Sequence, residues 1–293
     1  MSSNQLMLLG PHIKREKFPD QQRFLAVQSG FGAFQTHWGN PRTSIISDHE
    51  YELKFSNPKP EKDPIWVIHT AYTTSANPSY RNKDKVARYL INLINQSYYA
   101  GVKYIVLHVG AVKNLQVEWV STNICSFLEE YYILEALSLN KDNRKVKLLI
   151  ENMASVSPFN VDLKNLINVT NKYEDVGWCL DLCHAYAAGI SFKDLQEAID
   201  LCPPDVSHIN FPGSKFGSGK DRHGWRTTKS ILNNQLNYDS LVSPQDIISW
   251  DSIVKYLYSL RIPLILEGGS FPGVSMKEEL SFIRSMLQPE ESI

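Results

Sequence analysis

Short apolar runs alternate along the chain with longer segments in which apolar residues recur every three or four positions. The short runs are rich in β-branched, aromatic and leucine residues and almost continuously apolar, as expected of parallel strands that are covered on both faces. They predict eight strands, at Leu6–Ile13, Phe31–His37, Trp66–Tyr72, Tyr104–Gly110, Val146–Asn152, Val176–Leu182, Val206–Phe211 and Pro263–Gly269.

The segments between these runs have the period of amphipathic helices. We expect helices at Lys83–Ala100, Ser121–Leu139, Leu163–Tyr173, Phe192–Leu201, Trp250–Leu260 and Ser275–Leu287. Eight strands with intervening helices predict an α/β fold, a (β/α)₈ TIM barrel. Because such a barrel commonly fills this length alone, we predict a single domain over residues 1–293, with a frayed tail at 288–293.

Composition does little to narrow the function. The apolar share of 43% and the charged share of 21% are those of an ordinary globular protein. A formal net charge of −1 neither indicates nor excludes nucleic-acid binding, since local cations and bound metal ions also attract phosphate. We find no signal-peptide layout and no membrane-length apolar run, so we expect an intracellular protein, cytoplasmic or nuclear, without a membrane partner.

The chain has four cysteines, which form no CxxC pair and are too few for a disulfide framework. We therefore expect buried free thiols at Cys125, Cys179, Cys183 and Cys202.

Potential metal ligands recur where the later predicted strands end. Barrel active sites form at the carboxyl ends of the strands, so side chains at these positions should converge on one mouth. The candidates, in chain order, are His69, His108, Glu151, Asp181, His184, His208, Asp221, His223 and Glu267.

A single histidine at a strand end is more often a hydrogen-bonded core residue, and a lone buried glutamate is usually paired with a cation. Here, however, five of the eight histidines and four carboxylates occupy corresponding positions, with no matching set of Lys or Arg. Burying so many carboxylates together without cations would be very costly. The pattern therefore predicts two or three divalent ions, with zinc the leading candidate, and paired metals suit phosphoryl displacement.

The ligand-bearing motifs HTAY, LHVGA, IEN, CLDLCHAYAAG, the HIN…GSGKDRH block and ILEGG resemble the endonuclease IV family, also called apurinic/apyrimidinic endonuclease family 2. The resemblance runs from about Leu8 to Glu267 and is densest over Gly177–His223. It implies a monomeric DNA repair enzyme on a xylose isomerase-like barrel. Such an enzyme hydrolyses duplex DNA 5′ to abasic sites, leaving a 3′-hydroxyl and a 5′-deoxyribose phosphate, and trims blocked 3′ ends.

The resemblance also implies three Zn²⁺ ions, one or more of which could be Mn²⁺ or another divalent ion. The first would be held by His69, His108 and a bridging Glu151, the second by Glu151, Asp181, His208 and Glu267, and the third by His184, Asp221 and His223. The catalytic residues would be Glu151 and Glu267, which would position the hydroxide that attacks the phosphate.

Contacts with DNA are predicted from the same resemblance. Tyr72 stands three residues after His69, where the family places an aromatic side chain that enters the DNA at the lesion; packing against a neighbouring loop is the alternative. Basic side chains near the ligands would contact phosphates, or would simply be solvated. The further candidates are Gln35, Trp38, Lys215, Lys220 and Arg222.

The chain departs from the family pattern in its loops. Val109 stands where the family usually has proline after the fourth-strand histidine, and Ile209–Lys215 replaces an Asn-Asp-Ser-Lys sequence. The stretch between His223 and Pro263 is longer than in the family and lacks its glycine-rich segment. All nine candidate ligands remain, so these changes concern lesion preference more than the chemistry.

Two other functions fit a barrel with such ligands. A sugar isomerase or epimerase on the related xylose isomerase-like barrel also uses carboxylates and histidines around divalent ions, but it generally needs fewer ligands than this chain offers. The extra pair of Asp221 and His223 argues against it. A non-catalytic DNA- or protein-binding barrel would be expected to have lost ligands, and none is missing from the motifs.

Overall fold

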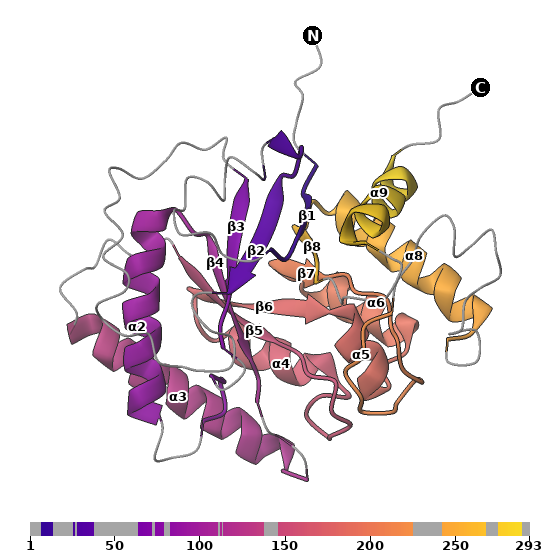
Figure 1. Ribbon diagram of the computed structural model, residues 1–293. Helices are drawn as coiled ribbons and strands as arrows, with labels where there is room; N and C mark the ends of the chain where they lie inside the picture. The colour runs from indigo at the N-terminus through magenta and orange to yellow at the C-terminus, as the bar shows by residue number, and fades with distance from the viewer. Residues whose placement is uncertain are drawn as a thin grey trace.

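The computed structural model describes one barrel-shaped body with helices on its outside (Figure 1). Among the helices it describes, none is both long enough and apolar enough to cross a membrane. The described residues are 7–13, 26, 28–37, 64–71, 74–78, 83–110, 112, 114–137, 146–224, 242–267 and 275–288. The predicted tail beyond residue 288 and the predicted DNA contacts Trp38 and Tyr72 lie outside these residues.

Eight parallel strands form one sheet in the order β1-β8-β7-β6-β5-β4-β3-β2. Each observed strand lies within its predicted range or begins one residue before it, which confirms the predicted TIM barrel. The strands are β1 (Leu9–Pro11), β2 (Ala33–His37), β3 (Ile65–His69), β4 (Tyr104–His108), β5 (Lys147–Glu151), β6 (Val176–Asp181), β7 (Val206–His208) and β8 (Leu264–Leu266).

The barrel closes between β1 and β2. The Gly32 amide donates a hydrogen bond of 2.8 Å to the carbonyl of Met7, and the Ile13 amide donates one of 2.8 Å to the carbonyl of Gln35. At this seam a Cβ on Gly10 would lie 1.7 Å from the carbonyl oxygen of Ala33, so only glycine allows the two strands to approach this closely. Closure brings the first two strands next to the last one.

Side chains inside the barrel form two layers. Because alternate residues of a strand face the same side, the residue two positions before each strand-borne candidate ligand also points inward. All six such residues belong to one buried apolar cluster of eight, the apolar layer, made of Ala33, Val67, Tyr104, Val106, Leu149, Cys179, Val206 and Ile265. The strand-borne candidate ligands are therefore the next inward-facing residues toward the carboxyl ends of the strands.

The register between neighbouring strands sets these polar residues at one level. His108 on β4 pairs with Glu151 on β5, and Asp181 on β6 pairs with His208 on β7. Residues between the inward-facing positions, such as Ile68 and Leu107, belong instead to the larger core that also contains buried residues of the helices. The barrel thus has an apolar interior at mid-height and a polar layer at its mouth.

The helices broadly match their predicted ranges, apart from the starts of two of them and one additional helix. α3 begins at Val117 rather than Ser121, and α8 begins at Pro244 because the Ser243 side chain caps it. α5 was not predicted at all. The helices are α2 (Lys83–Ala100), α3 (Val117–Leu137), α4 (Leu163–Thr170), α5 (Leu182–Ala188), α6 (Phe192–Leu201), α8 (Pro244–Ser259) and α9 (Met276–Leu287).

Candidate metal centre

The nine candidate ligands gather at the mouth of the barrel. His184 lies in α5, and Asp221 and His223 lie in the segment that follows β7. Glu267 directly follows β8, and the last residues of β3 to β7 are His69, His108, Glu151, Asp181 and His208. The predicted convergence of strand ends therefore places these side chains within reach of one another.

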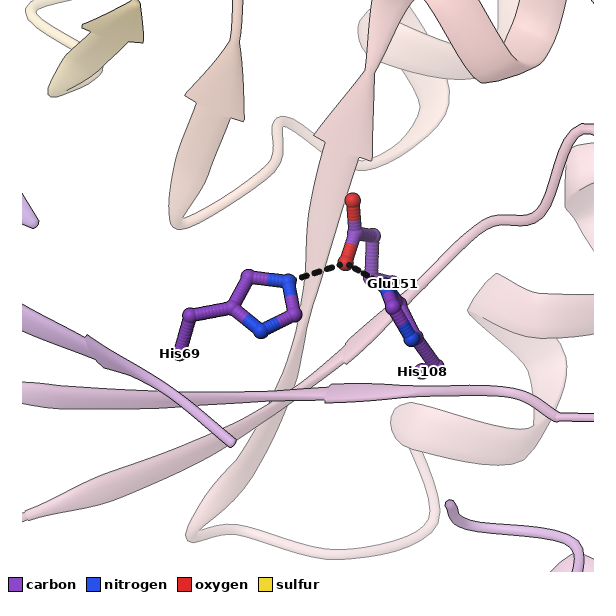
Figure 2. Close-up of side chains that lie close together, drawn as sticks. All are labelled: His69, His108 and Glu151. Atoms are coloured by element: carbon purple, nitrogen blue, oxygen red, sulfur yellow. Dashed lines mark hydrogen bonds and ion pairs between the residues drawn. The ribbon is translucent and has the colours of Figure 1, made fainter. Parts of the chain in front are cut away.

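Glu151 occupies the centre of the cluster and is fully buried. One carboxylate oxygen, Oε2, lies 3.1 Å from Nε2 of His69 and 3.1 Å from Nε2 of His108 (Figure 2). The other, Oε1, lies 3.0 Å from Nδ1 of His208. Burial alone would raise the pKa of Glu151, but His208 and His108 outweigh it and hold the pKa well below its usual value. We call Glu151, His69 and His108 the first group.

The second group joins Glu151 to Asp181, His208 and Glu267. Nδ1 of His208 lies 3.7 Å from a carboxylate oxygen of Asp181 and 3.7 Å from one of Glu267. Glu151, Asp181 and His208 are all fully buried. Three carboxylates around one imidazole carry more negative charge than that imidazole can balance, so the group has the charge of a cation site.

The third group consists of His184, Asp221 and His223 and lies nearer the solvent. Asp221 places one carboxylate oxygen 3.3 Å from Nε2 of His184 and the other 3.3 Å from Nε2 of His223. Burial lowers the pKa of His223, but the hydrogen bond that its protonated ring donates to Asp221 more than compensates and raises the pKa to about 9. The Cys183 thiol also approaches this group, since its sulfur and single ligand atoms of Asp221 and His223 lie within 4.8 Å of one another.

The local sequence explains how Asp181 and His184 come together. Asp181 ends β6 and is also the N-cap of α5, because its side chain accepts a hydrogen bond of 2.6 Å from the His184 amide. Gly189, with φ of +91°, ends the helix in the left-handed conformation that favours glycine. The motif CLDLCHAYAAG therefore encodes a strand end, a cap and a two-turn helix.

Three of the histidines have the same orientation relative to the backbone. The Nδ1 atoms of His69, His184 and His223 lie 2.8, 2.9 and 3.1 Å from the carbonyl oxygens of Thr70, Asn152 and Glu267. A carbonyl only accepts, so in each ring Nδ1 carries the hydrogen and Nε2 faces the carboxylates. Metal-binding histidines in proteins are usually fixed in this way through their second nitrogen.

Comparison with known proteins places the chain in a family. Residues 24–286 match the family described as xylose isomerase-like TIM barrel. The chain belongs to this family. It is 25% identical over 237 residues to a probable endonuclease 4 of Methanoculleus marisnigri, covering 74% of this chain and 82% of that protein. A probable endonuclease 4 of Halothermothrix orenii is 26% identical over 265 residues, covering 80% and 91%.

Among solved structures, the crystal structure of endonuclease IV from Thermus thermophilus superposes with a TM-score of 0.69. It is 21% identical in sequence, and the alignment covers 95% of this chain and 98% of that one. The fold of the xylose isomerase-like family is thus shared over nearly the whole chain, and the predicted resemblance to endonuclease IV is confirmed.

The structure adds polar residues that the sequence did not single out as partners of the ligands. Nδ2 of Asn210 lies 3.3 Å from Glu267 and 3.4 Å from Asp181, and the Glu267 amide donates to Asn210 Oδ1 at 2.7 Å. His12 and His37 occupy the mouth ends of the first two strands, where the later strands carry candidate ligands. Extending the strand-end rule to those two strands would have found them.

The predicted DNA contacts divide into two kinds. Lys215, Lys220 and Arg222 are exposed on the segment that also carries Asp221 and His223. Gln35, in contrast, is fully buried among the candidate ligands. All four cysteines are free thiols as predicted, but only two of them are fully buried, Cys179 and Cys183.

Proposed function

We propose that the protein is a metal-dependent endonuclease of DNA repair that hydrolyses duplex DNA 5′ to abasic sites. The observation that carries the proposal is the arrangement of nine His, Asp and Glu side chains in three linked groups at one barrel mouth, with Glu151 shared between the first and the second. The relatives named probable endonuclease 4, which align over most of this chain, support endonuclease activity.

The residues present suit divalent ions. Imidazole and carboxylate are the ligands that zinc binds in catalytic sites, and three histidines here have Nδ1 held by a backbone carbonyl and turn Nε2 toward carboxylates. The carboxylate of Glu151 lies between histidines of two groups, as a bridging ligand would. We propose three Zn²⁺ ions, held by the first, second and third groups, with Mn²⁺ or another divalent ion as an alternative.

Bound ions would polarise the phosphate and lower the pKa of the attacking water, which is the chemistry that phosphodiester hydrolysis needs. Glu151 and Glu267 would orient that water by accepting its hydrogens. The water oxygen joins the phosphorus as the bond from phosphorus to the 3′ oxygen breaks, and a proton ends on the 3′ oxygen. The products are a 3′-hydroxyl and a 5′-deoxyribose phosphate, and the same attack would trim blocked 3′ ends.

The exposed basic residues beside the third group would hold the DNA backbone. Lys215, Lys220 and Arg222 are exposed on the segment after β7, and we propose that they contact phosphates next to the scissile bond. Tyr72 and Trp38 remain predicted contacts. We propose that a single copy of the chain acts on one duplex.

The proposal is tested with a duplex that carries one abasic analogue. The purified protein should nick it next to the lesion, and chelation, Glu151→Gln and His69→Ala should each abolish nicking. The matched control is Glu197→Gln, which removes an exposed carboxylate on the outer helix α6 and should leave nicking intact. Protein that contains its full metal complement and does not nick this duplex would refute the proposal.

A sugar isomerase is the second candidate, since the family as a whole is described as xylose isomerase-like. That reaction moves a proton between sugar carbons, and the Asp221–His223 pair has no evident role in it. Turnover of a free aldose or ketose by the metal-loaded protein, without nicking of the abasic duplex, would favour this second candidate.

A further inference from the structure

Gln35 lies in a part of the barrel mouth to which β2 contributes no candidate ligand. Its side chain is fully buried and reaches two members of the second group. Its Oε1 lies 2.8 Å from Nε2 of His208, and its Nε2 lies 2.5 Å from Oε1 of Glu267. The same amide nitrogen is 2.9 Å from Nδ1 of His12. Both ends of the amide are therefore engaged inside the protein.

These contacts fix the direction of the amide. An ionised carboxylate only accepts hydrogen bonds, so the NH₂ of Gln35 must face Glu267. Its oxygen must then face His208, and an oxygen of an amide also only accepts. Nε2 of His208 therefore carries a hydrogen, and Nδ1 is the nitrogen that faces Glu151, Asp181 and Glu267.

In this respect His208 differs from three other histidines of the site. In His69, His184 and His223 the ring is fixed by a backbone carbonyl bound to Nδ1. In His208 the ring is fixed from the opposite nitrogen, by the Gln35 side chain from the other side of the barrel seam. A backbone carbonyl persists in every point variant, whereas a glutamine side chain can be replaced.

We propose that Gln35 is a positioning residue: it sets the tautomer of His208 and the orientation of Glu267, and so prepares the second group for its ion. The inference rests on the proposed metal site and assigns Gln35 a role different from the DNA contact predicted from its sequence position. The two roles differ in what they predict. A positioning residue changes metal affinity and kcat, whereas a DNA contact changes KM.

The first test needs no variant. Nitrogen-15 NMR of the zinc-loaded protein, with histidine labelled, should show a hydrogen on Nε2 of His208 and the metal-bound shift on Nδ1. His69, His184 and His223 should show the reverse pattern. A His208 ring with its hydrogen on Nδ1 would overturn the inference. If zinc does not bind at all, the proposed function itself fails.

The second test compares Gln35→Met with Thr36→Ala. Methionine fills similar space and forms no comparable hydrogen bond, so one of the bound ions should be lost to a competing chelator about 10–100-fold more readily, the range typical for outer partners of metal ligands. On the abasic duplex, kcat should fall by a similar factor with KM unchanged. The control residue, Thr36, is also fully buried on β2, and it accepts a hydrogen bond from Trp66 rather than contacting a ligand.

Thr36→Ala should lower the temperature of unfolding and leave metal affinity and kcat unchanged. A Gln35→Met protein with normal metal affinity and a raised KM would overturn the inference and support the DNA contact. Equal loss of metal by both variants would show that any disturbance of β2 weakens metal binding. This result would also overturn the inference. Metal affinity is measured without DNA, so that part of the test does not depend on the identity of the substrate.

Discussion

The first and third groups of candidate ligands differ in how the chain holds them. The first group stands on three adjacent strands, and Glu151 at its centre is 0% exposed. The third group draws Asp221 and His223 from the segment after β7, and the Asp221 side chain is 52% exposed. Strand register thus positions one group, whereas a loop and a short helix position the other.

This difference has physical consequences for metal binding. Ions held by fully buried ligands are protected from water and chelators, and removing one ligand there leaves uncompensated charge that solvent cannot relieve. At an exposed group, water can replace a lost ligand and added metal can reach the site. The strand-borne groups should therefore fail completely when altered, and the loop-borne group should fail partially and reversibly.

The largest effect is expected from Glu151→Gln. Because this carboxylate contacts histidines of both the first and the second group, two ions should be lost rather than one. The rate of incision should fall by more than about 100-fold, because replacing even a residue that only supports a metal ligand typically lowers metal affinity or activity by 10–100-fold. Metal analysis of purified protein gives the stoichiometry. A variant that keeps both ions would show that Glu151 does not join the two groups.

A smaller and reversible effect is expected from Asp221→Asn. One ion should be lost, and incision should fall by roughly 10–100-fold. Millimolar zinc or manganese should restore part of the activity, since His184 and His223 remain and the position is open to solvent. The same addition of metal should not restore the activity of the Glu151→Gln variant. Equal behaviour of the two variants would remove the distinction between buried and exposed groups.

The metal-free protein should lose stability as pH rises. In the folded chain the pKa of His223 is raised from its ordinary value of 6.5 to about 9. The stabilisation from this shift is fully present below pH 6.5 and is lost as pH increases through 9. Denaturant unfolding of chelated protein across this pH range measures it. His223→Gln should flatten the dependence in part, because the pKa of His184 is raised in the same direction.

The smallest effect is expected from Lys220→Ala. Lys220 is exposed and would contact a phosphate, so its loss should raise KM modestly. The slope of the logarithm of the DNA-binding constant against the logarithm of salt concentration should become shallower by about 1, with metal content unchanged. Lys255→Ala, on the outer helix α8, is the matched control and should change neither quantity. A changed metal content in Lys220→Ala would place this lysine in the metal site instead.

The barrel and the convergence of the candidate ligands could be predicted from the sequence because both follow from local rules. Each of His69, His108 and Glu151 ends an apolar run, and the end of a strand can be located closely from its pattern. The two-residue spacing from the apolar layer to the ligands is likewise a property of one strand at a time. The sequence of each strand already determines where it ends and which residues face inward, and pairing between strands then brings these residues together.

Two features escaped prediction for a different reason. α5 has only seven residues, too few for a helical period to be visible, and its limits depend on the side chain of Asp181 and the left-handed Gly189. The partners of Gln35 are 173 and 232 residues away in the chain. Gln35 meets these partners only because the barrel closes between β1 and β2, so the contact cannot be predicted from the sequence pattern around Gln35.

Asp181 shows what transplanting such a site would require. The same carboxylate that faces His208 also starts α5, and α5 carries His184 into the third group. A designer who grafts only the nine candidate ligands onto another barrel would therefore omit the turn that orients two of them, Asp181 and His184. The unit to transplant is the end of β6 together with its cap Asp181, the helix α5 and the glycine that ends this helix, Gly189.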